Sequence, residues 1–515
     1  MVSGRTHVLY CIFTLSCLIA LTCCGGEQSS LETSAPTEPL DSPCDTTCSA
    51  GAPTNLGSGV WRAQNASCGC INAAIQAASN NDTVQVPAGS YEWGNNVLSI
   101  TKPVKVIGAG SAGTCGDPNT TCIRTTGPSF TVHTGAENAP FRFRLSGFKL
   151  TTTGNTIMFV QGSGKDWRID NNIFEKASPK ATLTIFAANG GNTWTLFGVI
   201  DSNIFKHVGI DLVGSTAAAD HSWTSSAQWG TADAVFIENN TFYMQDTCGT
   251  TFNNSIDSSN GGRAVIRYND FNDAYIMAHS ACQMTVRGTR SYEIYNNRFN
   301  RTCPDFGGYV FLRAGSHVIT DNLVSGEWYP STGSAMADNR RSWFDPADLQ
   351  NSQCTGYRTP SFCCTGKKVG TCSGSMDGFG DCNGQSPYDT NSSPNGYRCL
   401  DQPGAGTGAI GKQTLDPIYL WNNASGRICL GGANRWSTCN ADSDCPGSSC
   451  STQANTPNAV YLHNNSNYQP EHILSGRDYM ENLAKPGYTK YPCPHYMTDA
   501  ASCNSKAGRV GYIRQ

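Results

Sequence analysis

Six short segments of this chain share one pattern: IDNNIF at 169–174, IDSNIF at 200–205, IENNTF at 237–242, IRYNDF at 266–271, IYNNRF at 294–299 and ITDNLV at 319–324. Each has an isoleucine followed three residues later by an asparagine, and the first five have a phenylalanine two residues after the asparagine. The asparagines are spaced by 31, 37, 29, 28 and 25 residues. A repeat of this length is typical of a supersecondary unit that stacks on copies of itself.

The pattern predicts where the side chains of each repeat point. Because side chains alternate along a strand, the isoleucine and phenylalanine are expected to point inward and stack on their counterparts about 4.8 Å away in the next coil. The asparagine is expected at the turn, where it tolerates a left-handed backbone and its amide bonds to neighbouring coils in a ladder. The residues two positions before the asparagines are then expected to face water: Asp170, Asp201, Glu238, Arg267, Tyr295 and Thr320.

The segment before the repeats predicts how the stack begins. INAAIQAAS at 71–79 has an amphipathic helical pattern, and DTVQVPAGSYEW at 82–93 and VLSITKPVKVIGAG at 97–110 alternate like strands. Over residues 68–325 this order resembles the right-handed parallel β-helix proteins of the pectate-lyase-like superfamily. The resemblance implies an all-β, right-handed parallel β-helix with a short N-terminal capping helix. It implies no single activity, because the superfamily contains lyases, hydrolases, epimerases and non-catalytic fibres.

The N-terminus predicts export. Arg5 and His7 precede an apolar run from Val8 to Thr22, which is typical of a secretory signal and too short for a confident membrane span. Cys23 resembles a lipoprotein acceptor, so lipid attachment to a bacterial membrane and simple cleavage both stay open. Of the cysteines, ten lie between Cys354 and Cys450, a density expected of disulfide-stapled loops in an oxidising compartment.

The charge composition argues against one class of binding partner. The net charge of -4 provides no basic surface for nucleic acid, which we do not expect to bind. We divide the chain into a signal peptide (1–23), a flexible linker (24–55), a parallel β-helix (56–345), Cys-rich loops and insertions with one further coil (346–456), and a last coil with a C-terminal cap (457–515).

The outward ladder offers one candidate site. If the coils are adjacent, Asp201 and Glu238 are about 5 Å apart. Carboxylates at this separation could carry out glycoside hydrolysis, and with Asp170 they could instead hold a cation such as Ca²⁺. A solvated polar face is the simpler interpretation, since every β-helix needs polar residues outside.

A second candidate active site lies between residues 257 and 313, where arginines are more frequent than in the rest of the chain. β-Elimination of a uronate needs a cation that neutralises the sugar carboxylate and a base that removes the proton at C5. Arg287 and Arg313 are the predicted carboxylate ligands, and His279 or Arg290 the predicted base. These arginines could equally form ion pairs between coils.

Aromatic residues could complete a glycan groove. Trp223 and Trp229 lie in a long predicted loop, where their faces could stack on sugar rings or pack as a lid on the coils. With Asp201, Glu238 and Arg267 they form the predicted substrate-binding set.

The sequence therefore predicts a secreted or surface protein whose partner is a polysaccharide or a cell-surface glycan. A polysaccharide lyase acting on acidic glycans is the leading hypothesis. A non-catalytic β-helix used in adhesion is the alternative, and a glycoside hydrolase using Asp201 and Glu238 is the third.

Overall fold

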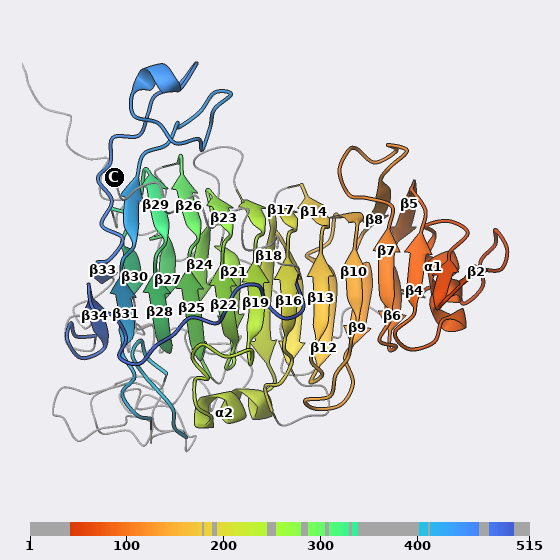
Figure 1. The fold of residues 1–515 in the computed structure, drawn as a ribbon, viewed down its shortest axis with the longest axis horizontal. Coiled ribbons are helices and arrows are strands. Elements are labelled where there is room, and N and C mark those ends of the chain that lie inside the picture. The colour runs from red at the N-terminus through yellow and green to blue at the C-terminus, as the bar shows by residue number, and fades with distance from the viewer. Residues whose placement is uncertain are drawn as a thin grey trace, which may run out of the picture. The chain divides into compact units, whose positions relative to one another are not determined.

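The computed structural model describes residues 42–177, 180–187, 193–244, 254–279, 287–303, 308–328, 332–337, 401–409, 413–462 and 473–498. From the fourth strand on, the chain visits three sheets in turn, so that each strand pairs in parallel with the strand three places further along. The first three strands differ, and the second and third form an antiparallel pair. The strands stack as successive coils of a parallel β-helix, as the repeats predict (Figure 1).

The three sheets differ in length. Sheet 1 contains β1 (Ser42–Pro43), β6 (Asn96–Ile100), β9 (Phe130–His133), β12 (Thr156–Gly162), β15 (Ala181–Ala187), β18 (Val208–Gly214), β21 (Asn254–Ser259), β24 (Tyr275–Ala278), β27 (Val310–Leu312), β30 (Ala335–Ala337) and β33 (Val460–Leu462). Sheet 2 contains β2 (Thr54–Gly57), β3 (Val60–Arg62), β4 (Thr83–Val86), β7 (Lys105–Gly108), β10 (Arg144–Ser146), β13 (Trp167–Asp170), β16 (Gly198–Asp201), β19 (Val235–Glu238), β22 (Arg263–Arg267), β25 (Ser291–Tyr295), β28 (Ser316–Thr320), β31 (Ile418–Trp421) and β34 (Tyr479–Glu481). Sheet 3 contains β5 (Gly89–Gly94), β8 (Thr121–Thr125), β11 (Phe148–Thr152), β14 (Ile173–Lys176), β17 (Ile204–Lys206), β20 (Thr241–Tyr243), β23 (Asp270–Asn272), β26 (Arg298–Arg301), β29 (Leu323–Gly326) and β32 (Ala424–Gly426).

The repeated asparagines form the predicted ladder at the turn from sheet 2 to sheet 3. The backbone N–H of Asn172 donates to Oδ1 of Asn203 at 2.9 Å, and that of Asn203 donates to Oδ1 of Asn240 at 2.9 Å. The same bond continues through Asn269, Asn297 and Asn322. Two further asparagines, Asn423 and Asn458, extend the ladder beyond the six repeats.

The left-handed backbone lies one residue earlier than predicted. The positive φ angles belong to the residue that precedes each ladder asparagine, as in Asn171 at 55°, Ser202 at 58° and Tyr268 at 58°. The prediction for the asparagines themselves was wrong because the tight turn is made before the ladder residue. The ladder side chain can then point inward, where its amide reaches the carbonyls of the neighbouring coil.

The inward columns are as predicted. The rings of Phe174, Phe205, Phe242, Phe271 and Phe299 stack face to face, with centroids 4.7–5.0 Å apart and planes 8–10° from parallel. The repeat isoleucines are fully buried beside them. Regular stacking of this kind buries a continuous apolar column and adds about 1 kcal/mol per aromatic pair beyond the area buried.

Two helices border the coils. The predicted capping helix is α1 (Cys68–Ala77), which buries Ile71, Ala74 and Ile75 at the N-terminal end of the stack. Disulfides from Cys44 to Cys68 and from Cys48 to Cys70 fasten the preceding segment to it. The second helix, α2 (Thr216–Thr224), follows β18, a middle strand of sheet 1, and lies beyond the ends of the strands near the middle of the stack (Figure 1).

The C-terminal third adds one coil and an insertion. Residues 418–426 form β31 and β32, and Val460–Leu462 forms β33 in sheet 1. Val460–Leu462 lies in the stretch predicted to hold a last coil, and it forms the third strand of the same coil as β31 and β32. Between them, disulfides Cys429–Cys445 and Cys439–Cys450 staple an insertion that includes the short 3-10 helix η3 (Asp442–Asp444).

Several predictions fall on residues outside the described part: the signal peptide, Cys23 as a lipid anchor, and most of the Cys-rich stretch. Among the helices in the described ranges, none has the length and apolar character needed to span a bilayer. The disulfides agree with an oxidising, extracytoplasmic compartment.

Candidate functional site

The predicted outward ladder has the expected register but not the expected exposure. Asp170, Asp201 and Glu238 occupy equivalent positions on neighbouring strands, followed by Arg267, Tyr295 and Thr320. All six side chains are buried, with no exposed surface. The prediction that they face water was wrong, because arginines of the same sheet and the C-terminal tail cover them.

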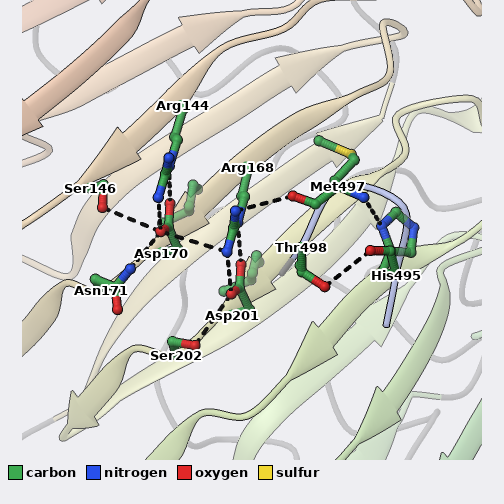
Figure 2. Close-up of polar contacts among 12 residues, drawn as sticks. Arg144, Ser146, Arg168, Asp170, Asn171, Asp201, Ser202, His495, Met497 and Thr498 are labelled. Atoms are coloured by element: carbon green, nitrogen blue, oxygen red, sulfur yellow. Dashed lines mark hydrogen bonds and ion pairs between the residues drawn. The ribbon is translucent and has the colours of Figure 1, made fainter. Parts of the chain in front are cut away.

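Arginines neutralise the ladder carboxylates (Figure 2). The Arg144 guanidinium donates to both oxygens of Asp170 at 2.7 and 2.6 Å. Arg168 donates to both oxygens of Asp201 at 2.8 Å, and Arg267 donates to Glu238 at 2.6 Å. The positive charge beside these carboxylates is therefore supplied by the protein itself, where the sequence had suggested Ca²⁺.

Residues 488–498, the C-terminal tail, complete the cover. Arg168 donates to the carbonyl of Met497 at 3.0 Å, and Arg267 donates to the carbonyl of Tyr491 at 2.9 Å. Thr498 donates to Glu238 at 3.3 Å. Burial raises the pKa of Asp201 to about 6 despite the Arg168 contact. The ladder carboxylates are therefore held in a closed polar layer between sheet 2 and the tail.

Arg287 and Arg290 are held in a second closed cluster. Arg287 makes a bidentate contact with Asp401 at 2.9 Å and donates to Asp220 at 2.9 Å. The guanidinium groups of Arg287 and Arg290 lie 5.0 and 5.2 Å from the ring centre of Trp223. All three side chains lack exposed surface. Trp229 lies apart from them, half-buried beneath the Lys485 ammonium.

Sheet 1 presents a different kind of surface. In its described strands the only Asp, Glu, Lys or Arg residues are Asp211 on β18 and Asp257 on β21. The two strands are neighbours and the two residues are directly paired in register. Strand spacing places their backbones about 4.8 Å apart. Two carboxylates side by side repel each other, and this repulsion lowers the stability of the fold. The other described strands of sheet 1 carry no such charges, so the pair is unusual within the sheet.

His279 and two cations meet this acid pair. His279, which follows β24, places Nδ1 3.3 Å from Oδ2 of Asp257, and its side chain is 35% exposed. The Lys180 ammonium lies 3.9 Å from Asp211 and donates to Asn254 at 2.7 Å. The charge of Arg313 also reaches Asp257. The structure thus brings His279 and Arg313 to the acid pair, whereas the guanidinium groups of Arg287 and Arg290 are held by Asp401, Asp220 and Trp223. The two groups adjoin through the backbone, because the N–H of Thr289 donates to the carbonyl of His279 at 2.9 Å.

The two carboxyl groups differ in pKa. Burial raises the pKa of Asp211, and Lys180 offsets this only in part. Burial also acts to raise the pKa of Asp257, but the charges of His279, Arg313 and Lys180 outweigh it and lower the pKa below its usual value. Neighbouring acids whose pKa values are pushed apart are suited to different proton-transfer roles.

No protein-family model, curated protein or solved structure matches this chain.

One oxygen of each central carboxylate, Oδ1 of Asp211 and Oδ1 of Asp257, is shielded from solvent without a hydrogen-bond partner among the described residues. Other side chains, such as Trp167 and Arg290, also have such atoms, so the unpaired oxygens alone do not mark the site, and it is identified by the contacts of the acid pair with His279 and Lys180. The cluster of Cys429, Cys439 and Cys445 has spacing compatible with a metal, but these cysteines form disulfides.

Sequence reasoning missed Asp211 and Lys180 and gave Asp257 no role. Sheet 1 strands carry no repeated motif, and the connections that lead to them vary in length, so their register could not be set from the asparagines. One signal was available. Asp211 and Asp257 are the single charged residues in two apolar and small-residue runs, VGIDLVG and NSIDSS.

Proposed function

We propose that the protein is an exported polysaccharide lyase that cleaves a uronate-containing glycan on the outer face of sheet 1. The proposal rests on the meeting of His279 with the acid pair Asp211 and Asp257. The fold agrees with the pectate-lyase-like superfamily that the sequence resembles. We assign the chain to the right-handed members of that group as part of the same proposal.

His279 is the proposed base. Asp257 accepts a hydrogen bond from Nδ1 of His279, which leaves the lone pair on Nε2 free to take a proton. The positive charges of Arg313 and Lys180 also act to lower the pKa of Asp257, so they favour its ionised form and keep the neutral imidazole oriented. At 3.3 Å the contact is long, as catalytic hydrogen bonds often are before substrate binds.

Asp211 is the proposed acid. Its raised pKa favours the protonated form, which can donate to the departing glycosidic oxygen. In this step His279 Nε2 takes the proton from C5 of the uronate, a double bond forms between C4 and C5, the C4–O bond breaks, and the Asp211 proton passes to that oxygen. The positive charges of Lys180 and Arg313 neutralise the sugar carboxylate. This neutralisation makes the proton at C5 of the uronate more acidic.

Glycoside hydrolysis is a second candidate at the same site. Two carboxyl groups on adjacent strands, one with a raised and one with a lowered pKa, are the arrangement needed by a retaining glycosidase. In that reaction Asp257 would be the nucleophile and His279 would have no proton to remove. The role of His279 therefore separates the two reactions.

The test is a screen of uronate-containing polymers with the full mature chain. A lyase releases products with a C4–C5 double bond, which absorb in the ultraviolet, whereas a hydrolase releases reducing ends without that absorbance. His279→Ala and Asp211→Asn are each expected to lower the lyase rate by at least about 100-fold. His221→Ala, on the exposed side of α2, is the matched control and should leave the rate unchanged.

Three results would overturn the proposal. Reducing ends without ultraviolet absorbance, lost in Asp257→Asn but kept in His279→Ala, would establish the hydrolase. Polymer binding without any turnover would establish a non-catalytic surface protein. Lyase activity that survives His279→Ala would place the reaction elsewhere on the molecule.

A further inference from the structure

The outer face of sheet 1 continues from the proposed site toward the N-terminal coils. Thr131, Phe159 and Thr184 occupy the positions that pair, strand by strand, with Asp211 and then Asp257. A second row two residues further along the strands contains His133, Gln161 and Phe186. These two rows, the upstream face, lie on the side of sheet 1 that a polymer entering the site along the coil axis would follow; Thr184 is buried, and the other five side chains are half-buried.

We propose that the upstream face binds uncharged sugar units, so that the substrate is a glycan in which the cleaved uronate is joined to neutral or amide-bearing sugars. This inference rests on the proposed function and adds the substrate class. Three features of the upstream face carry it: its lack of charge, a paired imidazole and amide, and two outward phenylalanines.

The upstream face has no charge to recognise a uronate. Strands β6, β9, β12 and β15 contain no Asp, Glu, Lys or Arg. Burial lowers the pKa of His133, which is therefore neutral near pH 7. A row of uronate carboxylates laid along these strands would lose water without gaining a counter-charge, and uncharged sugars would not carry that cost.

The imidazole and amide provide a hydroxyl-binding pair. Nε2 of Gln161 lies 3.0 Å from Nδ1 of His133. A neutral imidazole that accepts there carries its proton on Nε2. The side-chain oxygen Oε1 of Gln161 and the Nε2–H group of His133 then provide an acceptor and a donor, and neither has another hydrogen-bond partner among the described residues. Such a pair matches the vicinal hydroxyls, or the hydroxyl and amide, of an uncharged sugar.

The phenylalanines provide a stacking surface. Phe159 lies between buried Met158 and Val160, and Phe186 between buried Ile185 and Ala187, so both rings point out of the coil. Both are half-buried, in contrast to the fully enclosed phenylalanines of the core. Phe159 is two strands from Asp211, or roughly 9.5 Å along the axis. Aromatic faces favour the C–H faces of sugar rings in such positions.

The first test compares polymers. An alternating uronate–hexosamine polymer such as hyaluronan and a uronate homopolymer such as alginate or polygalacturonate are supplied to the wild-type chain. We expect a higher kcat/KM on the alternating polymer than on the homopolymers. A preference for a homopolymer would overturn the inference and leave the lyase proposal standing.

The second test measures binding and does not depend on turnover. Neutral oligosaccharides of glucose, mannose, galactose, xylose and N-acetylglucosamine are titrated into the wild-type chain by calorimetry. Phe186→Ala is expected to weaken the binding observed by about tenfold, and Phe186→Trp to retain it. Gln161→Ala is a second variant should Phe186→Ala fail to fold, and Tyr496→Ala, whose ring is exposed over the tail, is the control.

Each outcome decides one claim. If neutral oligosaccharides bind and Phe186→Ala weakens them, the upstream subsites stand even where no polymer is cleaved. If no neutral oligosaccharide binds the wild-type chain, or if Phe186→Ala and Gln161→Ala bind as tightly as it does, the inference fails. Loss of cleavage on every polymer would refute the lyase proposal alone.

Discussion

Each ladder asparagine bonds to both of its neighbouring coils. Asn269 accepts from the backbone N–H of Asn240 at 2.9 Å, and its Nδ2 donates to the carbonyl of Ile237 at 2.8 Å and to Oδ1 of Asn297 at 3.0 Å. These groups lie at a buried turn, where water could not replace the lost bonds. The side chain therefore satisfies backbone groups that the sheets on either side leave unpaired.

We predict that Asn269→Ala lowers the free energy of unfolding by about 3 kcal/mol. The change removes the acceptor of the Asn240 N–H and the amide donor to the carbonyl of Ile237, both at a buried turn. Chemical denaturation measures it, with Asn119→Ala as the control, because Asn119 is exposed in a loop and its side chain makes no contact of this kind. Equal stability of the two variants would show that the ladder contributes little.

The C-terminal tail is the element that the sequence least reveals. The Tyr491 ring packs on Phe236 with centroids 5.0 Å apart, and the Lys490 ammonium reaches Asp321 at 2.6 Å. The Tyr496 hydroxyl donates to Asp166, and the contacts of the tail therefore join residues separated by 169–330 positions along the chain. In Figure 1 the tail crosses the strands of sheet 2 from the C-terminal coils toward the middle of the stack. It ties several coils together and shields the buried ladder charges.

We predict that Tyr491→Ala loosens the tail without unfolding the coils. The ring also lies 5.6 Å from the Arg267 guanidinium, so its loss admits water to the Arg267–Glu238 pair. Amide hydrogen exchange should become faster in residues 488–498 and in β19 and β22, and stay unchanged in sheet 3. Leu483→Ala is the control, because that side chain is 51% exposed and lies before the tail. Uniform exchange in both variants would mean that the tail is held by other contacts.

At the scale of the whole molecule, the sequence repeat predicted the β-helix architecture and the detailed register of two of its three sheets. The isoleucine and asparagine repeat set the register of sheets 2 and 3, because a motif at a tight turn aligns the strands on both sides of it. Sheet 1 follows connections of variable length and carries no such motif, so the pairing of Asp211 with Asp257 was not predictable.

The burial of the ladder was also beyond local reasoning. Asp201 and Glu238 were predicted to face outward, and they do lie on the outer face of their strands. The residues that cover them, Met497 and Thr498, lie some 260 or more positions away in the sequence. Alternation along a strand predicts which face of the sheet a side chain occupies. It does not predict what packs on that face.

Buried carboxyl groups under the tail link the stability of the whole molecule to pH. Burial raises the pKa of Glu293 to about 7, although Tyr488 donates to it at 2.6 Å and the N–H of Gly230 at 3.0 Å. Its ordinary value is 4.5, so between about pH 4.5 and 7 the folded chain binds this proton more tightly than the unfolded chain does. The contribution of Glu293 to stability is then present at low pH and is lost as the pH rises through about 7.

Buried histidines oppose this trend. Burial lowers the pKa of His495 to about 3 and that of His317 to about 4, so each favours the folded state above its unfolded value near 6.5 and loses that contribution as the pH falls. The dependence of the wild-type free energy of unfolding on pH combines both effects, so the contribution of Glu293 is isolated by comparing a variant with the wild type.

We predict that Glu293→Gln becomes more stable relative to wild type by about 3 kcal/mol between pH 4.5 and 7.5. Denaturation at several pH values measures this difference. Glu92→Gln, whose side chain is 68% exposed, should show no such change, and a difference that stays flat with pH would mean that Glu293 ionises normally beneath the tail.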